Sequence, residues 1–346
     1  MKRYIFILVL LQCLSLFNLN KVVAQDVHLS QFYASPLSLN PAYTGDYKGD
    51  WRLMNSYRNQ WLTSFHAPYT TNAFAYDRQF YLFNENISGG IIWVQDKSGD
   101  AMLKVTKIAL SLAYHKTIQA NTFHIGYQAG FVQKGFSADK LSYPNQYNGD
   151  PDKISQGLFD VSMPNNENFA GEQLSYFDMN LGFSYSRKFN LVEPKIGFSL
   201  FHLNRPKESF FDKDPKLPMR SVLDLSAKVD LSAKFFLMPK VLYMYHASAN
   251  EMVFGSNLGY KLRENKITAK SVFGGILLRS GAARNTDAFV CIAGVNFKNL
   301  DLGISYDNTI SDLQLANNHI GGFELSIIYT GMSTLLEKKA IPCDRY

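Results

Sequence analysis

Long hydrophobic runs are scarce in this 346-residue chain. Beyond residue 24, no segment approaches the roughly 18 consecutive apolar residues of a membrane-spanning helix. The mean hydropathy of −0.14 excludes a protein built from many such helices. Cysteine is also rare. Only Cys291 and Cys343 lie beyond residue 24, which is too few for a disulfide framework.

A strong charge and catalytic motifs are likewise lacking. The net charge is +6 without a basic cluster, so nothing indicates nucleic-acid binding. The G-x-S-x-G motif of serine hydrolases does not occur, and the seven histidines share no H-x-x-x-H or H-E-x-x-H spacing. The residues therefore predict no metal site and no catalytic role for the histidines. A hydrolase whose serine and histidine meet only in the folded chain is the alternative.

The N-terminus has the order of features found in a secretory signal. Lys2 and Arg3 form a basic start, an apolar core follows over 4–17, and small or modest residues precede Gln25. Because this core is shorter than the roughly 20 residues of a membrane anchor, we expect residues 1–24 to be removed. An uncleaved anchor is the alternative.

Aromatic residues are abundant and fall in alternating segments. The chain has 26 Phe and 20 Tyr, which favour strands and membrane interfaces. Along 181–189, apolar residues alternate with small or polar ones, so one strand face is oily and the other is not. Near Lys107 the alternation changes phase, which indicates a bulge or a misplaced boundary. We predict fourteen strands: 51–62, 71–83, 87–96, 102–117, 122–134, 174–188, 194–204, 219–233, 238–247, 251–263, 267–279, 286–297, 300–307 and 319–330.

The predicted connections differ in length between the two ends of these strands. Connections after odd-numbered strands include every long one, such as 135–173 and 205–218, whereas those after even-numbered strands stay within about five residues. This asymmetry is typical of outer-membrane barrels, whose closed sheet pairs its own backbone groups in lipid. The sequence therefore predicts an all-β fold: a transmembrane antiparallel up-and-down β-barrel of about 14 strands. A soluble β-sandwich is the alternative.

The predicted organisation has four parts. A signal peptide (1–24) precedes a turn-rich, irregular segment (25–50) that is either a periplasmic lead-in or a plug. The barrel covers 51–331, and a tail (332–346) follows. Since both ends of the barrel fall on the side with short turns, we expect an outer-membrane location with both termini in the periplasm.

Several short stretches are spread along the chain from residue 29 to its last residue. They are, in order, Leu29-Ser30-Gln31-Phe32, Asn40-Pro41-Ala42-Tyr43-Thr44-Gly45, Tyr57-Arg58-Asn59-Gln60-Trp61, Gly303-Ile304-Ser305-Tyr306-Asp307, Gly322-Phe323-Glu324-Leu325 and Pro342-Cys343-Asp344-Arg345-Tyr346. In their order and spacing they resemble the PorP/SprF family of type IX secretion system outer-membrane proteins of Bacteroidota. Asp344 departs from the expected proline. The resemblance implies a role in a secretion and gliding apparatus, in which such barrels assist the export or surface attachment of large cargo proteins such as adhesins. It implies no enzymatic activity and no cofactor.

These stretches supply the candidate partner-binding or structural residues. They are Asn40, Pro41, Tyr43, Gly45, Tyr57, Arg58, Asn59, Gln60, Trp61, Cys343, Arg345 and Tyr346. We expect loops 135–173 and 205–218 to meet cargo outside, and residues 26–50 and 332–346 to meet secretion machinery in the periplasm. Outer-membrane lipid is a further expected partner. A transport channel for small solutes, open or plugged, is the alternative function.

Overall fold

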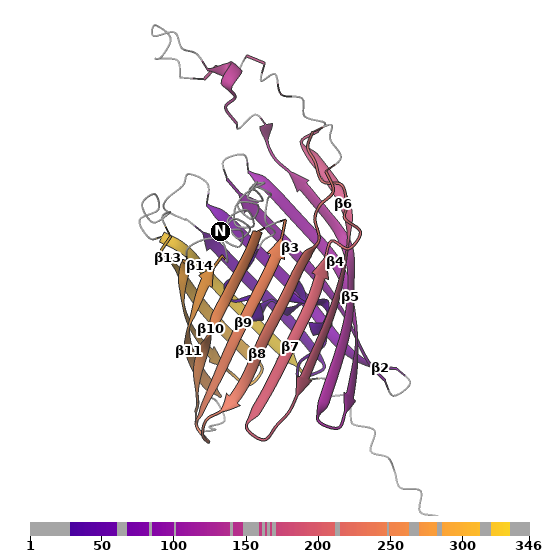
Figure 1. Ribbon diagram of the computed structural model, residues 1–346, viewed down its shortest axis with the longest axis vertical. Coiled ribbons are helices and arrows are strands. Elements are labelled where there is room, and N and C mark those ends of the chain that lie inside the picture. The colour runs from indigo at the N-terminus through magenta and orange to yellow at the C-terminus, as the bar shows by residue number, and fades with distance from the viewer. Residues whose placement is uncertain are drawn as a thin grey trace, which may run out of the picture.

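Fourteen strands form a closed barrel in the computed structural model (Figure 1). The structure describes residues 28–60, 68–82, 85–99, 102–138, 141–147, 159–160, 163–164, 167, 171–211, 215–247, 249–262, 270–281, 286–311 and 320–332. The predicted signal peptide, Trp61 and the chain beyond residue 332 lie outside these ranges.

Each strand pairs antiparallel with its neighbours in the chain, and β1 pairs with β14 to close the sheet. The strands are β1 (Trp51–Gln60), β2 (Tyr69–Leu82), β3 (Glu85–Ser98), β4 (Leu103–Ile118), β5 (Asn121–Gly135), β6 (Gln173–Arg187), β7 (Val192–Phe201), β8 (Arg220–Asp230), β9 (Phe235–His246), β10 (Ala249–Lys261), β11 (Ser271–Ser280), β12 (Thr286–Asn296), β13 (Leu300–Thr309) and β14 (Ile320–Gly331). The predicted all-β, up-and-down barrel is confirmed.

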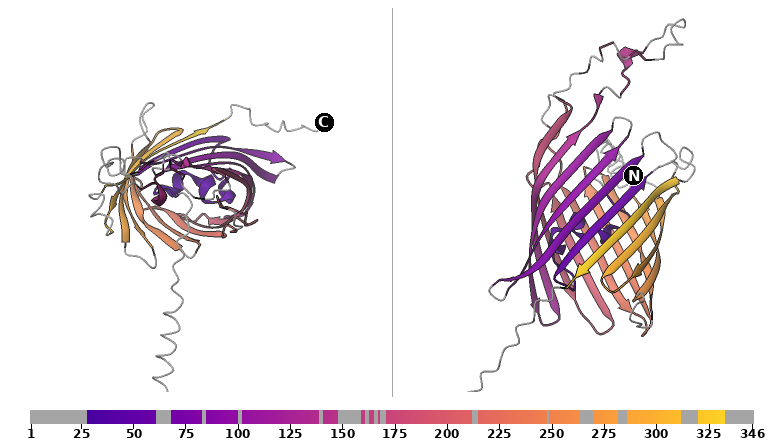
Figure 2. Two further views of the ribbon diagram at one scale, coloured as in Figure 1. Left: turned by 90° about the horizontal axis from the view of Figure 1, so that it is seen from above. Right: turned by 180° about the vertical axis from the view of Figure 1, so that it is seen from behind.

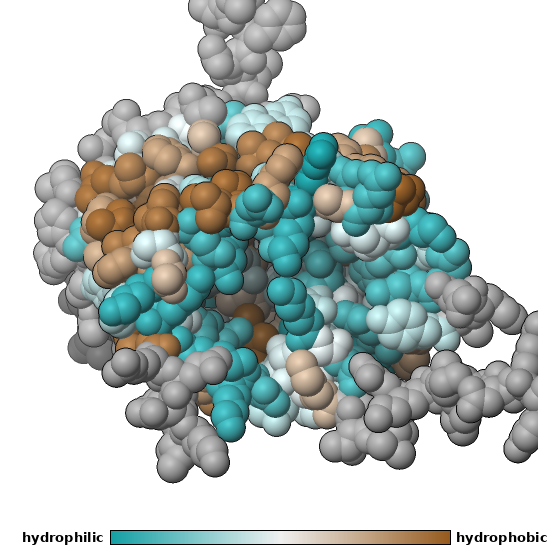
Figure 3. All heavy atoms as spheres, turned by 90° about the horizontal axis from the view of Figure 1, so that it is seen from below, coloured by the Kyte–Doolittle hydropathy of each residue, from teal (hydrophilic) through white to brown (hydrophobic). Residues whose placement is uncertain are grey.

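Side chains alternate between an outer face and a lumen face along each strand. In β5, Phe123, Ile125 and Phe131 are exposed on the outside, whereas His124 and Gln128 are buried inside. An apolar outer band is what a barrel in lipid requires. At the end that carries the short turns, hydrophilic side chains border a hollow (Figure 3).

The phase change near Lys107 in β4 is neither a bulge nor a misplaced boundary. The pairing of β4 with β3 and with β5 runs through Lys107 without a shift. Leu103 and Val105 continue the inward-facing series of Ala109 and Ser111, and they line the lumen near the end with the long connections. The interpretation was wrong because it assumed a lumen face that stays polar along the whole strand.

The barrel wall is higher on one side. Strands β2 to β6 have 14 to 16 residues, whereas β7, β8, β11 and β13 have 10 or 11. Because about 9–11 residues cross a membrane, the longer strands extend beyond it at the end with the long connections (Figure 1). β6 pairs with β7 only over 181–186.

The connections follow the predicted asymmetry with one exception. The long connections 136–172 and 202–219 lie at one end of the barrel, and the short connections 119–120 and 188–191 lie at the other. We call these the loop end and the turn end. The connection 262–270 belongs to the turn end and is longer than predicted, because β11 begins at Ser271 and not at 267.

Residues 28–50, which we call the lumen segment, lie inside the barrel (Figure 2). They form three short turns: η1 (Phe32–Ala34), α2 (Pro36–Leu39) and η2 (Pro41–Tyr43). Pro36 and Pro41 each open a turn, a position where the missing N–H has no cost. Asn40 caps η2, since its side-chain oxygen accepts a hydrogen bond from the Ala42 N–H (2.9 Å).

The lumen segment runs from the loop end to the turn end. The His28 imidazole lies 3.5 Å from the Glu251 carboxylate, near the start of β10. The Gly45 N–H donates to Asp77 in the part of β2 that approaches the turn end. His28 and Met332, the two ends of the described chain, therefore lie at opposite ends of the barrel. The described chain therefore begins at the loop end, where His28 lies beside Glu251, and reaches β1 at the turn end.

Candidate functional site in the lumen

A buried cluster of charges holds the start of the lumen segment. The Arg58 guanidinium is ion-paired with Glu324 and with Asp307, where Nη2 lies 2.9 Å from Oδ2. The Ser30 hydroxyl donates to Asp307 (2.7 Å). The backbone N–H groups of Ser30 and Gln31 donate to the two carboxylate oxygens of Glu324 (2.6 and 2.8 Å). The lumen segment thus supplies hydrogen bonds that two barrel carboxylates need.

Arg279 adds a second cation to this cluster. Its Nη1 lies 2.9 Å from Asp307 Oδ2 and 3.1 Å from the Ser30 hydroxyl, and its Nε pairs with Asp287 (2.8 Å). Both guanidinium groups and the carboxylates of Asp307 and Glu324 are at most 6% exposed. Buried charges stay ionised when each has an opposite charge and hydrogen bonds. The cluster is therefore one interdependent unit.

Sequence stretches that are far apart meet in this cluster. Ser30, Arg58, Asp307 and Glu324 come from four of the stretches that carried the family resemblance. The contacts explain the residue types at these positions. The two carboxylates on the inner wall need a guanidinium between them and N–H donors from the lumen segment. Of the predicted site residues, Arg58 lies in the lumen and is ion-paired with Asp307 and Glu324; its role in partner binding stays a prediction.

Asn40 fixes the middle of the lumen segment to the wall. Its Nδ2 donates to the carbonyls of Phe183 on β6 (3.1 Å) and Phe198 on β7 (3.3 Å). A Cβ on Gly182 would overlap the Asn40 side chain, and one on Gly126 would overlap the Pro41 backbone. The wall is therefore glycine-rich here because the lumen segment approaches its backbone closely.

Tyr43 and Asp46 form the next set of contacts. The Tyr43 hydroxyl donates to Asp224 (2.5 Å), and burial together with this carboxylate raises the Tyr43 pKa. The Lys195 ammonium lies over the Tyr43 ring (3.7 Å) and is ion-paired with Asp46. Burial alone would raise the pKa of Asp46, but the charges of Lys195 and of His124, if protonated, together with the hydrogen bond from Lys195 hold it below its usual value. Asp46 is therefore an anion at neutral pH.

Asp77 receives the end of the lumen segment. Its Oδ2 accepts from the Gly45 N–H (2.7 Å) and from Arg52 Nη2 (2.6 Å). Arg52 also donates to the Tyr43 carbonyl (3.0 Å) and stacks over the Tyr47 ring (4.4 Å). Gly45 has φ +76°, a left-handed conformation that glycine adopts without strain. The sequence Tyr43–Gly45 thus turns the chain toward β1.

Histidines pair across strands in a way that chain spacing did not reveal. His115 and His124 are opposite residues on β4 and β5, with their Nδ1 atoms 2.5 Å apart. The Ser88 hydroxyl lies 2.9 Å from His115 Nε2. Both histidines lie four residues from the tight turn at 119–120, so the pairing of a β-hairpin around this turn could have predicted that they face each other. The histidine spacings of metal sites on helices could not have predicted this pair.

The remaining predicted site residues divide between the two faces of β1 or lie outside the description. Tyr57 and Asn59 face outward, and the Asn59 amide donates to the Tyr57 hydroxyl (3.4 Å). Gln60 has the inward parity of Arg58. Trp61, Cys343, Arg345 and Tyr346 lie outside the described residues, so they stay predictions.

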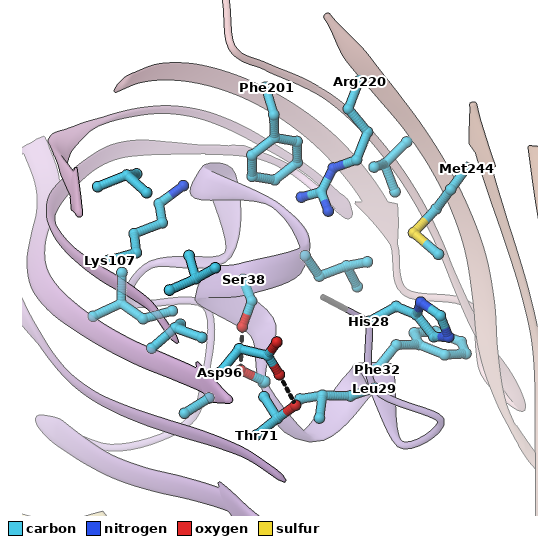
Figure 4. A pocket seen from close by; sticks show the side chains of 18 of the residues that line it. His28, Leu29, Phe32, Ser38, Thr71, Asp96, Lys107, Phe201, Arg220 and Met244 are labelled. Carbon is cyan, nitrogen blue, oxygen red and sulfur yellow. Dashed lines mark hydrogen bonds between the residues drawn. The ribbon is translucent and has the colours of Figure 1, made fainter. Parts of the chain in front are cut away.

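A cavity of about 280 Å³ lies between the lumen segment and the loop end (Figure 4). Its walls are mostly apolar and include Ile92, Val94, Val105, Val132, Leu242 and Met244. The connection 202–219 packs beside it: Leu217 contacts Val132 and Tyr176. Glu208 accepts hydrogen bonds from Lys134 (2.5 Å) and from the Tyr176 hydroxyl (2.8 Å).

In the described part of the chain, no helix has the length and apolar character needed to span a membrane. No group of three or more His, Cys, Asp or Glu side chains there is arranged to hold a metal ion.

The family of the chain follows from a match along most of its length. The family model described as "Type IX secretion system membrane protein PorP/SprF" matches residues 22–329. The chain belongs to the PorP/SprF family. This PorP/SprF barrel therefore combines an outer-membrane fold with membership of a secretion-system family.

Solved barrel structures are similar to this PorP/SprF chain at low identity. The CymD monoaromatic hydrocarbon channel is 10% identical, with 87% of this chain and 93% of that chain covered and a TM-score of 0.49. BamA from Haemophilus ducreyi lacking POTRA domains 1–3 is 9% identical, with 82% and 70% covered and a TM-score of 0.42. No curated protein matches the chain.

Proposed function

We propose that this chain is a non-enzymatic scaffold in the outer membrane that assists the export or surface attachment of a large cargo protein by the type IX secretion system. The observation that carries the proposal is the lumen segment, whose polar groups are bonded to the inner wall from Ser30 to Gly45. A lumen filled by its own chain suits a docking component better than an open pore. In this proposal the lumen segment is a plug.

The loop end is the proposed cargo side. It carries the connections 136–172 and 202–219 and the part of the wall that rises beyond the membrane. Toward the loop end of β6, the Met179 carbonyl accepts a hydrogen bond from the Leu203 N–H, and the Met179 N–H donates to the Asn204 side chain. Every second residue of a strand directs its backbone N–H and C=O groups to the same edge. Gln173 and Ser175 therefore direct theirs to the edge that Met179 uses, in the part of β6 that does not pair with β7. Such an edge suits main-chain pairing with an extended cargo segment.

The turn end is the proposed machinery side. We assign the contacts with periplasmic components to the short connections and to the tail 332–346. The lumen segment is bonded to the inner wall, so it does not belong to this contact surface. The proposed orientation places the turn end in the periplasm, as the loop asymmetry of outer-membrane barrels implies.

Replacing 136–172 by a short turn tests the cargo side. The barrel is expected to insert normally, because the strands on both sides keep their pairing, while surface-exposed cargo falls to the level of a strain without the protein. Insertion is checked by protease protection of the barrel in isolated outer membranes. Unchanged cargo display with a correctly inserted barrel would refute this assignment.

A solute channel is the second candidate, and the cavity at the loop end is the observation that favours it. Conductance across a planar bilayer distinguishes the two. The scaffold predicts a wild-type barrel with little steady current, whereas a channel predicts a stable, solute-permeable conductance.

A further inference from the structure

A carboxylate faces the apolar cavity at the loop end of the lumen. Asp96, on β3, is among the lining residues, and its Oδ1 accepts a hydrogen bond from the Thr71 hydroxyl (2.6 Å). Figure 4 shows Asp96 among the cavity side chains, close to Thr71 and Ser38. Within the described ranges, no cation is ion-paired with Asp96 and its Oδ2 accepts no hydrogen bond. Asp96 thus has unused capacity for a donor.

The cationic side chains around this cavity are already engaged. Lys107 is paired with Asp178 (2.8 Å), and Lys134 is paired with Glu208 (2.5 Å). The Arg220 guanidinium lies over the Phe201 ring (4.1 Å). A ligand cation at Asp96 would therefore not compete with these side chains for the carboxylate.

His28 does not supply the missing charge either. The nearby Glu251 carboxylate favours the imidazolium form, but burial and the charges of Arg279 and Arg58 outweigh it and lower the His28 pKa. The imidazole is therefore neutral at pH 7. Among the residues that the structure describes, Asp96 therefore has no cationic side chain as an ion-pair partner.

The shape and chemistry of the cavity restrict what it can hold. Its floor is the lumen segment, where Leu29, Phe32 and Leu39 line it, and the 202–219 connection packs beside it. Its volume of about 280 Å³ is close to that of small-ligand pockets. Apolar walls gain from covering an apolar body, and a carboxylate in such surroundings gains most from a charged donor.

We propose that this cavity binds a small amphiphile with an apolar body and an ammonium group, and that the ammonium donates to Asp96. The apolar body lies along the walls formed by residues such as Val94, Val105 and Met244. Thr71 orients the carboxylate through its hydrogen bond to Oδ1, which leaves Oδ2 to accept from the ammonium. The proposal is independent of the secretion role, since it concerns the barrel alone.

Calorimetry on the full barrel in lipid nanodiscs tests this proposal. The probes are n-hexylammonium, n-hexanol and n-hexanoate, which share one apolar body, and empty nanodiscs measure partition into lipid. We expect hexylammonium to bind about tenfold more tightly than the other two, as a charge-assisted hydrogen bond implies. In Asp96→Asn the preference for the ammonium probe should disappear.

Asp301→Asn is the matched control. Asp301 also faces the lumen and accepts one side-chain hydrogen bond, from Asn296 (2.8 Å), but it does not line the cavity. This variant should keep the wild-type preference. Equal binding of the three probes to the wild type, no binding at all, or a preference that survives Asp96→Asn would overturn the proposal.

Val105→Trp provides a second variant that leaves Asp96 in place. The larger side chain fills the cavity from β4, so the affinity for hexylammonium should fall at least about tenfold. Unchanged affinity in this variant would place the probe elsewhere and refute the site, even if Asp96→Asn failed to insert.

Discussion

Arg58 and Glu324 lie directly opposite each other on β1 and β14, the strands whose pairing closes the barrel, and they form a buried ion pair. Glu324 also accepts the backbone N–H groups of Ser30 and Gln31. One carboxylate therefore takes part both in barrel closure and in docking of the lumen segment. Because charged groups in such a network depend on one another, we expect the two processes to be coupled.

Replacing the cation of this pair should destabilise the barrel. Arg58→Met leaves the carboxylates of Glu324 and Asp307 with fewer partners in a buried site, so the free energy of unfolding should fall by about 3–5 kcal/mol. Urea unfolding of the barrel, followed by tryptophan fluorescence, measures this change. Lys116→Met is the control, because the Lys116–Glu85 pair is exposed and should contribute little. Similar urea midpoints for both variants would contradict the predicted role of the cluster.

A methyl group on the inner wall should displace the lumen segment. In Gly182→Ala the new Cβ would overlap the Asn40 side chain, so the contacts of Asn40 with β6 and β7 should be lost. We expect a several-fold increase in conductance across a planar bilayer compared with the wild type. Gly274→Ala is the control, since the nearest heavy atom to its Cβ is the Ile292 carbonyl oxygen at 3.7 Å. Equal conductance of the two variants would argue against a plug.

Removing Lys195 should weaken the docking of the lumen segment most at neutral pH. The Asp46 pKa is lowered, so the stabilisation by this carboxylate is complete above the ordinary carboxyl pKa of about 4 and is lost only as the pH falls through the lower folded value. In Lys195→Met, burial raises the Asp46 pKa, so this stabilisation is already missing at pH 7, and acid costs the variant less stability than it costs the wild type. Urea midpoints of the two proteins should therefore differ most at pH 7 and converge toward pH 3.

Lys261→Met is the control for this pH series. Lys261 pairs with Asp230 near the turn end, where both side chains are more than a third exposed. Its removal should leave the acid profile of the barrel close to that of the wild type. A difference in urea midpoint between Lys195→Met and the wild type that is the same at pH 7 and at pH 3 would show that the charge of Asp46 does not anchor the lumen segment.

Weakening the contact of the 202–219 connection should expose it to protease. In Glu208→Gln the charge that accepts from Lys134 and from the Tyr176 hydroxyl is lost. Trypsin should then cut at Lys207 or Lys216 several-fold faster in the intact barrel, because cleavage tracks local opening. Glu193→Gln, an exposed residue near the turn end, should leave the cleavage rate unchanged.

Much of the fold could be read from local pattern, but the interior could not. Alternation in β5, β8 and β13 predicted their extent and outer faces because side chains of a strand point to opposite sides with a period of two. The same rule gave the wrong interpretation near Lys107. There the lumen face is apolar, and the alternation of apolar and polar residues therefore changes phase in the sequence although the strand is regular. The pattern shows which residues are apolar, but it does not show whether they face lipid or an apolar cavity.

The sequence predicted some residues of the candidate site but not the residues that they contact. Arg58, Asn40 and Tyr43 were singled out from stretches that resemble a family, but the resemblance did not reveal their partners. Asp224, Asp77 and Glu324 lie from 25 to 294 positions away from the residues they bind, so only pairing of the whole sheet brings them together. Glu324 was noted as part of a short stretch, while Asp77 and Asp224 carried no signal of their own.

The sequence by itself determined an alternating, aromatic-rich chain with long connections at one end, and this was enough to specify an up-and-down barrel. Backbone groups in lipid leave no other arrangement for such strands. Tertiary structure decided what fills the barrel. The lumen segment is short, turn-rich and without periodicity, so its place depends on the glycines, carboxylates and arginines that fourteen strands bring to one inner wall.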